Sequence, residues 1–334
     1  MTKKLINDAG TVIEEMLAGI VAAHPRHVRL LDHSPRSLIA AGAPRAGKVG
    51  IVVGGGSGHE PGFLGYVGRG MADGAAVGNP FASPGPDPIV ATTKAVHGGA
   101  GVLYIIGNYA GDVMNFEMAA ELAELESIPT RTVIVTDDVA SAPISEAGRR
   151  RGVAGAVFVF KAAGAAADMG RDLSGVAQAA EMANASVRTM GVALEPCSLP
   201  ATLKHNFTLR PDELELGIGI HGEPGVERGP MRPADAVADA ILDRVLAELD
   251  PPPGSEVAVL VNGMGGTPLM ELYIIARHVL DRLSRRNLVI HRCLVGNFLT
   301  ALEMAGCSVS VIKLNDELKV LLDYPAEPVL FRDF

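Results

Sequence analysis

The stretch KVGIVV, residues 48–53, runs directly into GGGSGHEP, residues 54–61. The first half is a short apolar run rich in β-branched residues, which predicts a buried strand. The second half has no side chains for three residues and then places Ser57, His59 and Glu60 in close succession. Glycines at a strand end let the chain turn sharply and let a ligand approach the main chain. Because ligands of open α/β sheets bind at the carboxyl ends of strands, this stretch predicts an α/β sheet with a site at its edge.

Two familiar nucleotide-binding glycine loops are excluded at this position. A phosphate-binding P-loop ends in Gly-Lys-Ser/Thr, and no lysine follows Gly58. The dinucleotide fingerprint needs Gly-x-Gly-x-x-Gly; Gly54 and Gly56 fit this pattern, but its third glycine position is His59. A tight turn without chemistry would explain the three glycines alone. The polar residues that follow them favour a site.

The composition is that of an ordinary well-packed protein. A chain of 334 residues is longer than one hydrophobic core usually serves, which predicts two domains. The net charge of −9 argues against a nucleic-acid-binding protein, which would normally carry a basic stripe. Cys197, Cys293 and Cys307 lack metal-site spacing, which favours free thiols in a reducing compartment. With no signal-peptide core and no apolar run of membrane-spanning length, we expect a cytoplasmic protein that binds neither nucleic acid nor membrane.

Apolar strands, glycine-bearing loops and helices alternate through the first half of the chain. This alternation predicts a largely parallel sheet covered by helices, in a first domain of residues 1–184. Residues 24–47 are polar and interrupted by prolines, which predicts a loop, and the prolines of residues 74–87 predict a rigid loop. Besides the strand at 49–53, we expect strands at 101–106, 132–135 and 157–160, and helices at 8–23, 88–97, 115–127 and 161–184.

The second half predicts another α/β domain, residues 185–334. A Pro-Pro-Pro-Gly break at 251–254 interrupts it. The fold class is therefore α/β, with two α/β domains, each a mostly parallel or mixed sheet covered by helices. We expect strands at 187–194, 214–220, 257–261, 288–294 and 308–314, and helices at 233–249 and 269–286.

Three predicted loop tips carry side chains suited to acid, base or nucleophilic chemistry: His59, Asp112 and His221. Each follows an apolar strand and lies among glycines. Catalytic groups are often displayed in this way, on loops held by a rigid sheet. A hydrogen-bonded structural role would explain any one of them alone, and a helix N-cap would explain Ser83 alone. Taken together, these residues favour a small-molecule site.

Longer motifs surround these residues and carry a family resemblance. They are GGGSGHEP at 54–61, Asn108-Tyr109 with Gly111-Asp112 and Asn115-Phe116, Gly148-Arg149-Arg150, GIGIHGEPG at 217–225, and Asn262 with TPLMELY at 267–273. In this order they resemble the substrate-binding (K) subunit of dihydroxyacetone kinase, over nearly the whole chain. The two histidine-containing motifs are long and specific.

The resemblance implies a role for each site residue. A family histidine that matches His221 attacks the carbonyl carbon of the ketone and holds it as a hemiaminal, so that glycerol, which has no carbonyl, is rejected. Asp112 matches the aspartate that takes the proton of the substrate hydroxyl attacking phosphorus. His59 matches a histidine that hydrogen-bonds the substrate and assists as acid or base. The substrate contacts carried over are Gly56, Ser57, Ser83 and Gly111.

The resemblance also implies a division of labour, since this chain completes no nucleotide-binding loop. The chain itself is then expected to bind neither a cofactor nor a metal. A separate, all-helical L subunit holds Mg²⁺ and ADP or ATP and docks over the ketone site. Two phosphoryl donors stay open, the phosphotransferase system and ATP. The family resemblance further implies a homodimer.

The loop before Asp112 departs from the family pattern. The family loop usually begins Lys-Asn-Tyr-Thr-Gly-Asp, whereas this chain has Gly107 and Ala110 in place of the lysine and threonine. Losing a cation and a hydroxyl widens and neutralises the pocket, so a larger ketose such as erythrulose or another tetrulose stays an alternative to dihydroxyacetone. Another alternative is a non-catalytic, dihydroxyacetone-binding co-regulator. The joint presence of His59, Asp112 and His221 favours the kinase, because a sensor needs the covalent histidine but not the base.

Overall fold

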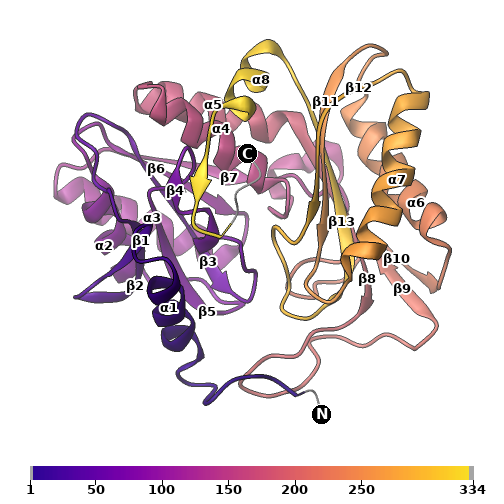
Figure 1. Ribbon diagram of the computed structural model, residues 1–334, viewed down its shortest axis with the longest axis horizontal. Coiled ribbons are helices and arrows are strands. Elements are labelled where there is room, and N and C mark those ends of the chain that lie inside the picture. The colour runs from indigo at the N-terminus through magenta and orange to yellow at the C-terminus, as the bar shows by residue number, and fades with distance from the viewer. Residues whose placement is uncertain (1–2, 331–334) are drawn as a thin grey trace. The chain divides into compact units, whose positions relative to one another are not determined.

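The computed structural model describes residues 3–330, which fall into two compact units. The terminal unit comprises Lys3–Val135, Val159–Met182 and, as far as the structure describes it, 320–330. The central unit comprises Thr136–Phe158 and Ala183–Lys319. Each unit holds a six-stranded sheet with helices packed on it (Figure 1). The predicted fold class, two α/β domains with helix-covered sheets, is confirmed.

Within residues 3–330 the chain passes between the two units four times. The first passage follows β7 (Thr130–Val135), and the others lie within α4 (Ala156–Asp168), α5 (Leu173–Ser186) and α8 (Asp316–Asp323). A single boundary at residue 184 assumes continuous domains. It falls within two residues of the passage in α5, but it assigns residues 136–158 and 320–330 differently from the compact units. The outer limits of the predicted domains, residues 1 and 334, lie outside the described residues.

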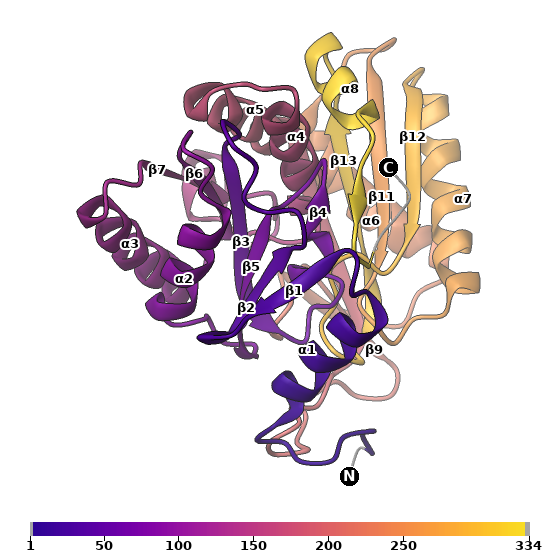
Figure 2. The same ribbon diagram turned by 60° about the vertical axis from the view of Figure 1, so that its left-hand side comes forward.

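The sheet of the terminal unit has the strand order β1-β2-β5-β3-β6-β7. Its strands β5, β3, β6 and β7 are parallel, so their carboxyl ends meet at one edge, and the antiparallel hairpin of β1 and β2 extends the other side. Helices α2 and α3 pack against each other and against this sheet (Figure 2). The bounds are β1 Val28–Leu31, β2 Ser34–Ala40, β3 Gly50–Ser57, β5 Gly74–Pro80, β6 Val102–Gly107, α2 Pro86–Val96 and α3 Ala110–Leu125.

The sheet of the central unit has the order β10-β9-β8-β13-β11-β12, and only β11 and β12 pair in parallel. Helices α6 and α7 pack against each other and against its strands (Figure 1). In α7 the buried side chains recur every three or four residues, which builds one apolar face toward the sheet. The bounds are β8 Val187–Glu195, β9 Glu213–Leu216, β10 Glu227–Pro230, α6 Ala234–Leu249, β11 Glu256–Gly263, α7 Leu269–Arg285, β12 Val289–Gly296 and β13 Ala305–Lys313.

Smaller elements complete the terminal unit. Helix α1 (Val12–Ala23) packs on β1 and β2. Strand β4 (Gly68–Arg69) pairs antiparallel with β14 (Glu327–Pro328), so the end of the described chain joins a segment from its first quarter. Within residues 3–330, no helix combines the length and the apolar character that crossing a bilayer requires.

Two predicted loops contain strands instead. Residues 24–47 form the hairpin of β1 and β2, whose outward-facing polar side chains and prolines conceal the strand pattern. The first part of residues 74–87 is β5, a strand of glycine, alanine and valine whose small side chains give no alternation. In both cases pairing with neighbouring strands, which a local pattern does not contain, decides the structure.

The predicted strand at 157–160 is also wrong, because these residues lie in α4. All four side chains are buried, and a short run that is buried on every side has the same apolar pattern in a strand and in a helix. The predicted strand at 214–220 ends already at Leu216. The predicted helix at 161–184 is two helices, α4 and α5, separated by a break at residues 169–172. The sequence did not predict β4, β10, α8 or β14. The remaining predicted strands and helices are confirmed, with shifts of up to five residues at their ends.

Candidate functional site

The glycines that open the candidate site lie inside β3 and not in the turn after it. At Gly56 a Cβ atom would lie 2.5 Å from the backbone nitrogen of Ala82, so only glycine lets the two chain segments approach this closely. The sharp turn comes later, at Gly58, where φ is +93°. The glycines therefore bring β3 against the loop that follows β5.

Gly56→Ala is expected to lower the free energy of unfolding by about 1–3 kcal/mol, the usual cost of overpacking a tight site. All three obstructing atoms at this position belong to backbone, which cannot rotate away. Equilibrium denaturation in urea measures the change. Gly42→Ala is the matched control, because Gly42 is exposed and has open space around its Cβ position. Equal stability of the two variants would contradict the close approach.

His59 is buried and held between aromatic rings. Its side chain is 1% exposed, and its imidazole stacks on Phe81, with ring centroids 4.9 Å apart and planes inclined by 17°. Phe63 meets the same imidazole edge-on at 6.1 Å. Phe81 itself has a φ of +58° and is fixed by a hydrogen bond from its N–H to the carbonyl of Ser57. The imidazole thus has one orientation, as an acid or base in a site requires.

Asp112 lies in the first turn of α3, with 6% exposure. The unpaired N–H groups of a helix start favour negative charge there. Ser83 lies against the same turn, since a Cβ atom on Gly111 would lie 3.2 Å from its side chain, and Asn115 Nδ2 donates to Ser83 Oγ at 3.2 Å. Ser83 is not a helix N-cap, because the N-cap of α2 is Gly85.

Six of the seven predicted site residues therefore belong to one edge of the terminal sheet. Gly56 and Ser57 end β3 and His59 follows it, Ser83 follows β5, and Gly111 and Asp112 begin the helix after β6. These three strands are adjacent and parallel. Ser57 is turned away from open space, because its hydroxyl donates to the carbonyl of Gly78 and its side chain is buried. The functional roles of the six residues stay predictions.

His221, the seventh residue, lies in the central unit, in the loop that follows β9. Its side chain is 22% exposed. The backbone around it is fixed from two directions: Asn206 Nδ2 donates to the His221 carbonyl at 2.9 Å, and the Gly219 N–H donates to the Glu223 carbonyl at 3.0 Å. The imidazole is therefore presented to solvent by a loop of defined shape.

Glu223 determines which imidazole nitrogen of His221 carries the proton. Its Oε1 lies 2.9 Å from Nδ1 of His221, and its Oε2 accepts the backbone N–H of His221 at 3.0 Å. Burial opposes ionisation of this carboxyl, but the hydrogen bonds and charge of His221 outweigh it and lower the pKa of Glu223 to about 2. An ionised carboxylate only accepts. Nδ1 must therefore donate its proton to Glu223, and in the neutral ring Nε2 is the nitrogen without a proton.

Glu223 lies within the motif at 217–225, but the sequence alone assigns it no role. The available signal was the spacing His-Gly-Glu, which lets a carboxylate fold back onto the ring two residues earlier. The similar motif at 59–61 does not repeat this arrangement: both carboxylate oxygens of Glu60 accept the Gly58 N–H, at 3.0 and 3.1 Å. Burial raises the pKa of Glu60. The two motifs thus place their carboxylates differently.

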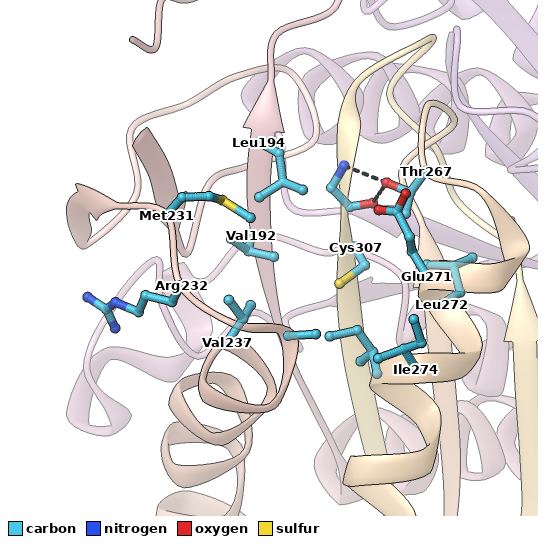
Figure 3. A pocket seen from close by; sticks show the side chains of 13 residues that line it. Val192, Leu194, Met231, Arg232, Val237, Thr267, Glu271, Leu272, Ile274 and Cys307 are labelled. Carbon is cyan, nitrogen blue, oxygen red and sulfur yellow. Dashed lines mark hydrogen bonds between the residues drawn. The ribbon is translucent and has the colours of Figure 1, made fainter. Parts of the chain in front are cut away.

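An apolar cavity of about 110 Å³ lies in the central unit between β8, β13, α6 and α7 (Figure 3). None of the predicted site residues lines it. Cys307 does, but burial, helped by the charge of Glu271, raises the pKa of this thiol to about 12, so it stays protonated. All three cysteines are free thiols. Among the described residues, no three His, Cys, Asp or Glu side chains are grouped to hold a metal.

Curated proteins similar to this chain are named as dihydroxyacetone kinase subunits and erythrulose kinases. A family model described as the Dak1 domain matches residues 18–329. The dihydroxyacetone-binding subunit of the PTS-dependent dihydroxyacetone kinase 2 of Listeria innocua is 48% identical over 330 residues, which cover 99% of both chains. The D-erythrulose kinase of Mycolicibacterium smegmatis is 44% identical over 98% of this chain, which spans 56% of that kinase.

Solved structures show the same relationship. The dihydroxyacetone kinase of C. freundii in complex with AMP-PNP and Mg²⁺ matches with a TM-score of 0.88 and 32% identity, over 98% of this chain and 60% of that chain. A dihydroxyacetone kinase operon co-activator matches with a TM-score of 0.86 and 33% identity, over 94% and 96% of the two chains. Because the family model covers far more than half of its residues, this chain belongs to the Dak1 domain family.

Proposed function

We propose that this chain is the substrate-binding subunit of a dihydroxyacetone kinase, which captures a small ketose covalently on His221. The observation that carries the proposal is the hydrogen-bonded pair of His221 and Glu223. This pairing leaves Nε2 as the nucleophile of a partly exposed side chain, while the other ring nitrogen, Nδ1, is held by an ionised carboxylate. This is the arrangement of a nucleophile whose orientation and protonation are set by a neighbouring group.

Capture proceeds by addition to the carbonyl. The Nε2 lone pair forms a bond to the carbonyl carbon, and the electrons of the C=O π bond move to oxygen. The ring then carries positive charge, which Glu223 stabilises through its hydrogen bond to Nδ1–H. The Nδ1 proton leaves the ring as the new alkoxide takes up a proton, so the product is a neutral hemiaminal. Glycerol has no carbonyl carbon to attack and is excluded by this chemistry.

Transfer makes a different demand, because a substrate hydroxyl must become nucleophilic as it meets phosphorus. We assign Asp112 as the group that accepts its proton, since the carboxylate is buried at a helix start that favours its charge. Gly56, Ser83 and Gly111 form the surrounding contacts, and His59 assists as a hydrogen-bond partner. The nucleotide and Mg²⁺ belong to a partner subunit, which supplies the phosphoryl group when bound.

The proposal predicts a reversible gain of one ketose mass when the intact protein is incubated with dihydroxyacetone. The reason is that a hemiaminal forms without loss of water, so the mass of the whole substrate is added. Intact-protein mass spectrometry measures it, and dialysis removes it. Glycerol at the same concentration is the control and is expected to add nothing. Failure of dihydroxyacetone and erythrulose alike to add mass would contradict covalent capture.

A larger ketose is the second candidate substrate. Gly107 ends β6, the strand that leads to Asp112, and supplies no side chain where the family pattern has lysine. The 44% identity to a D-erythrulose kinase supports the same reading. Competition between dihydroxyacetone and erythrulose for the adduct decides between them. The co-regulator alternative, supported by the co-activator structure, predicts adduct formation without turnover in the presence of a nucleotide-bearing partner.

A further inference from the structure

We infer that Arg151 is a positioning residue for His221, an inference that rests on the proposed capture of ketose by that histidine. Arg151 does not belong to the loop that carries His221, and no motif of the sequence marks it. Its side chain spans from a buried aspartate to the first residue of that loop. The loop is thereby tied to the interior of the central unit.

One end of the link is anchored in the core. Arg151 Nε donates to Asp138 Oδ2 at 2.8 Å, and Asp138 is 2% exposed. The other carboxylate oxygen of Asp138 accepts the N–H of Ala140 at 3.0 Å, which fixes the carboxylate itself. The backbone of Arg151 is held as well, because its N–H donates to Ser141 Oγ at 3.0 Å and its carbonyl accepts the N–H of Asp138. The guanidinium therefore projects from a rigid base.

The other end of the link holds the His221 loop. Arg151 Nη2 donates to the carbonyl of Gly217 at 2.8 Å, at the point where β9 has just ended. Farther along, Gly219 lies closely packed between Arg151 and Glu223: a Cβ atom there would lie 2.5 Å from Arg151 Nη1 and 2.1 Å from Glu223 Oε2. This Oε2 is the atom that accepts the His221 N–H.

These contacts connect the guanidinium to the state of the imidazole. Glu223 reaches back to His221 only while the loop keeps its tight turn, and Arg151 holds both the start of that turn and the glycine within it. If the turn relaxes, the carboxylate no longer holds Nδ1–H, and the ring loses its fixed orientation and tautomer. An arginine suits this role because its planar fork donates in two directions at once, which a lysine ammonium on a flexible stem does less well.

The test compares Arg151→Gln with Arg151→Lys and with the control Arg285→Gln, an exposed arginine of α7 in the same unit. The dissociation constant of the dihydroxyacetone adduct is measured by titration and intact-protein mass spectrometry. We expect Arg151→Gln to weaken the adduct about 10- to 100-fold, by analogy with the loss caused by removing a group that orients a metal-binding histidine. Arg151→Lys is expected to recover part of this loss, and Arg285→Gln to match the wild type.

A second readout separates this inference from the proposed function. Long-range ¹H–¹⁵N NMR of His221 reports its tautomer without any substrate, and we expect the Nδ1–H form in the wild type and a mixture of tautomers in Arg151→Gln. An unchanged tautomer together with an unchanged dissociation constant would overturn the inference, whatever the effect on melting temperature. If the wild type forms no adduct, the proposed function fails, while the NMR comparison still decides the role of Arg151.

Gly219→Ala serves where Arg151→Gln does not fold. Its added methyl group enters the narrow space between Arg151 and Glu223 but leaves the hydrogen bond from Arg151 to Asp138 intact. We expect the same mixture of tautomers and a weaker adduct. Its control is Gly229→Ala, because the Cβ position of Gly229 meets no atom closer than 3.6 Å. A Gly219→Ala protein that retains the wild-type tautomer and affinity would refute the proposed link.

Discussion

His221→Ala is expected to abolish the ketose adduct completely. The alanine side chain has no lone pair to attack the carbonyl carbon, and the proposed chemistry has no second nucleophile. Cys293 and Cys307 do not replace it: burial raises the pKa of Cys293 to about 11, and that of Cys307, which is also close to Glu271, to about 12, so both thiols stay protonated near neutrality. Intact-protein mass spectrometry with dihydroxyacetone, under the conditions used for the wild type, measures the loss.

The matched control for this variant is His33→Ala. His33 is an exposed histidine in the turn between β1 and β2, outside the candidate site, and its removal is expected to leave the adduct unchanged. An adduct of full yield on the His221→Ala protein would show that another residue captures the ketose. Peptide mapping of that adduct would then identify it.

Asp112→Asn is expected to separate capture of the ketose from phosphoryl transfer. Asparagine is nearly isosteric with aspartate but cannot accept the hydroxyl proton, and loss of a general base typically costs ~10²–10⁴ in rate. Capture needs only His221 and a carbonyl, so the adduct should form with nearly normal affinity. Stability should fall little, because a charge at a helix start contributes about 0.3–1 kcal/mol. Turnover with the nucleotide-bearing partner and the adduct mass are measured on the same preparation.

Glu117→Gln is the control for this second variant, since Glu117 lies on the exposed face of the same helix. Its turnover and adduct should match the wild type. Two outcomes would contradict the role given to Asp112. Near-normal turnover of Asp112→Asn would reduce the residue to positioning, and loss of its adduct would show that Asp112 mainly orients the ketose for capture.

The sequence predicts the elements that carry the site better than the rest of the fold. Strands β3 and β6 are apolar runs that lead into glycine, and polar residues come next in each case, so pattern and candidate site coincide. The hairpin of β1 and β2 escapes prediction because half of each strand faces solvent and its pairing partner β5 lies more than thirty residues away. The run at 157–160 escapes because complete burial removes the period that distinguishes helix from strand.

The residues of the candidate site were likewise predictable only in part. His59, Asp112 and His221 were found because histidine and aspartate among glycines are conspicuous in a sequence. Glu223 and Arg151 were not, because their roles depend on two distances across a folded loop: 2.9 Å to the His221 ring and 2.8 Å to the Gly217 carbonyl. The His-Gly-Glu spacing permits the first contact, but a pattern of residue types does not show that the folded loop brings these atoms so close.

The pairing of β4 with β14 has a consequence for how the protein is made. On a ribosome residues 3–135 emerge early, yet the terminal unit to which they belong also needs residues 320–330, which are translated only after the whole central unit. The residues of the central unit lie between these two segments in the sequence and are synthesised in the interval. Completion of the terminal unit therefore waits until the central unit has been synthesised, and a chain that stalls before residue 327 leaves β4 without its pairing partner.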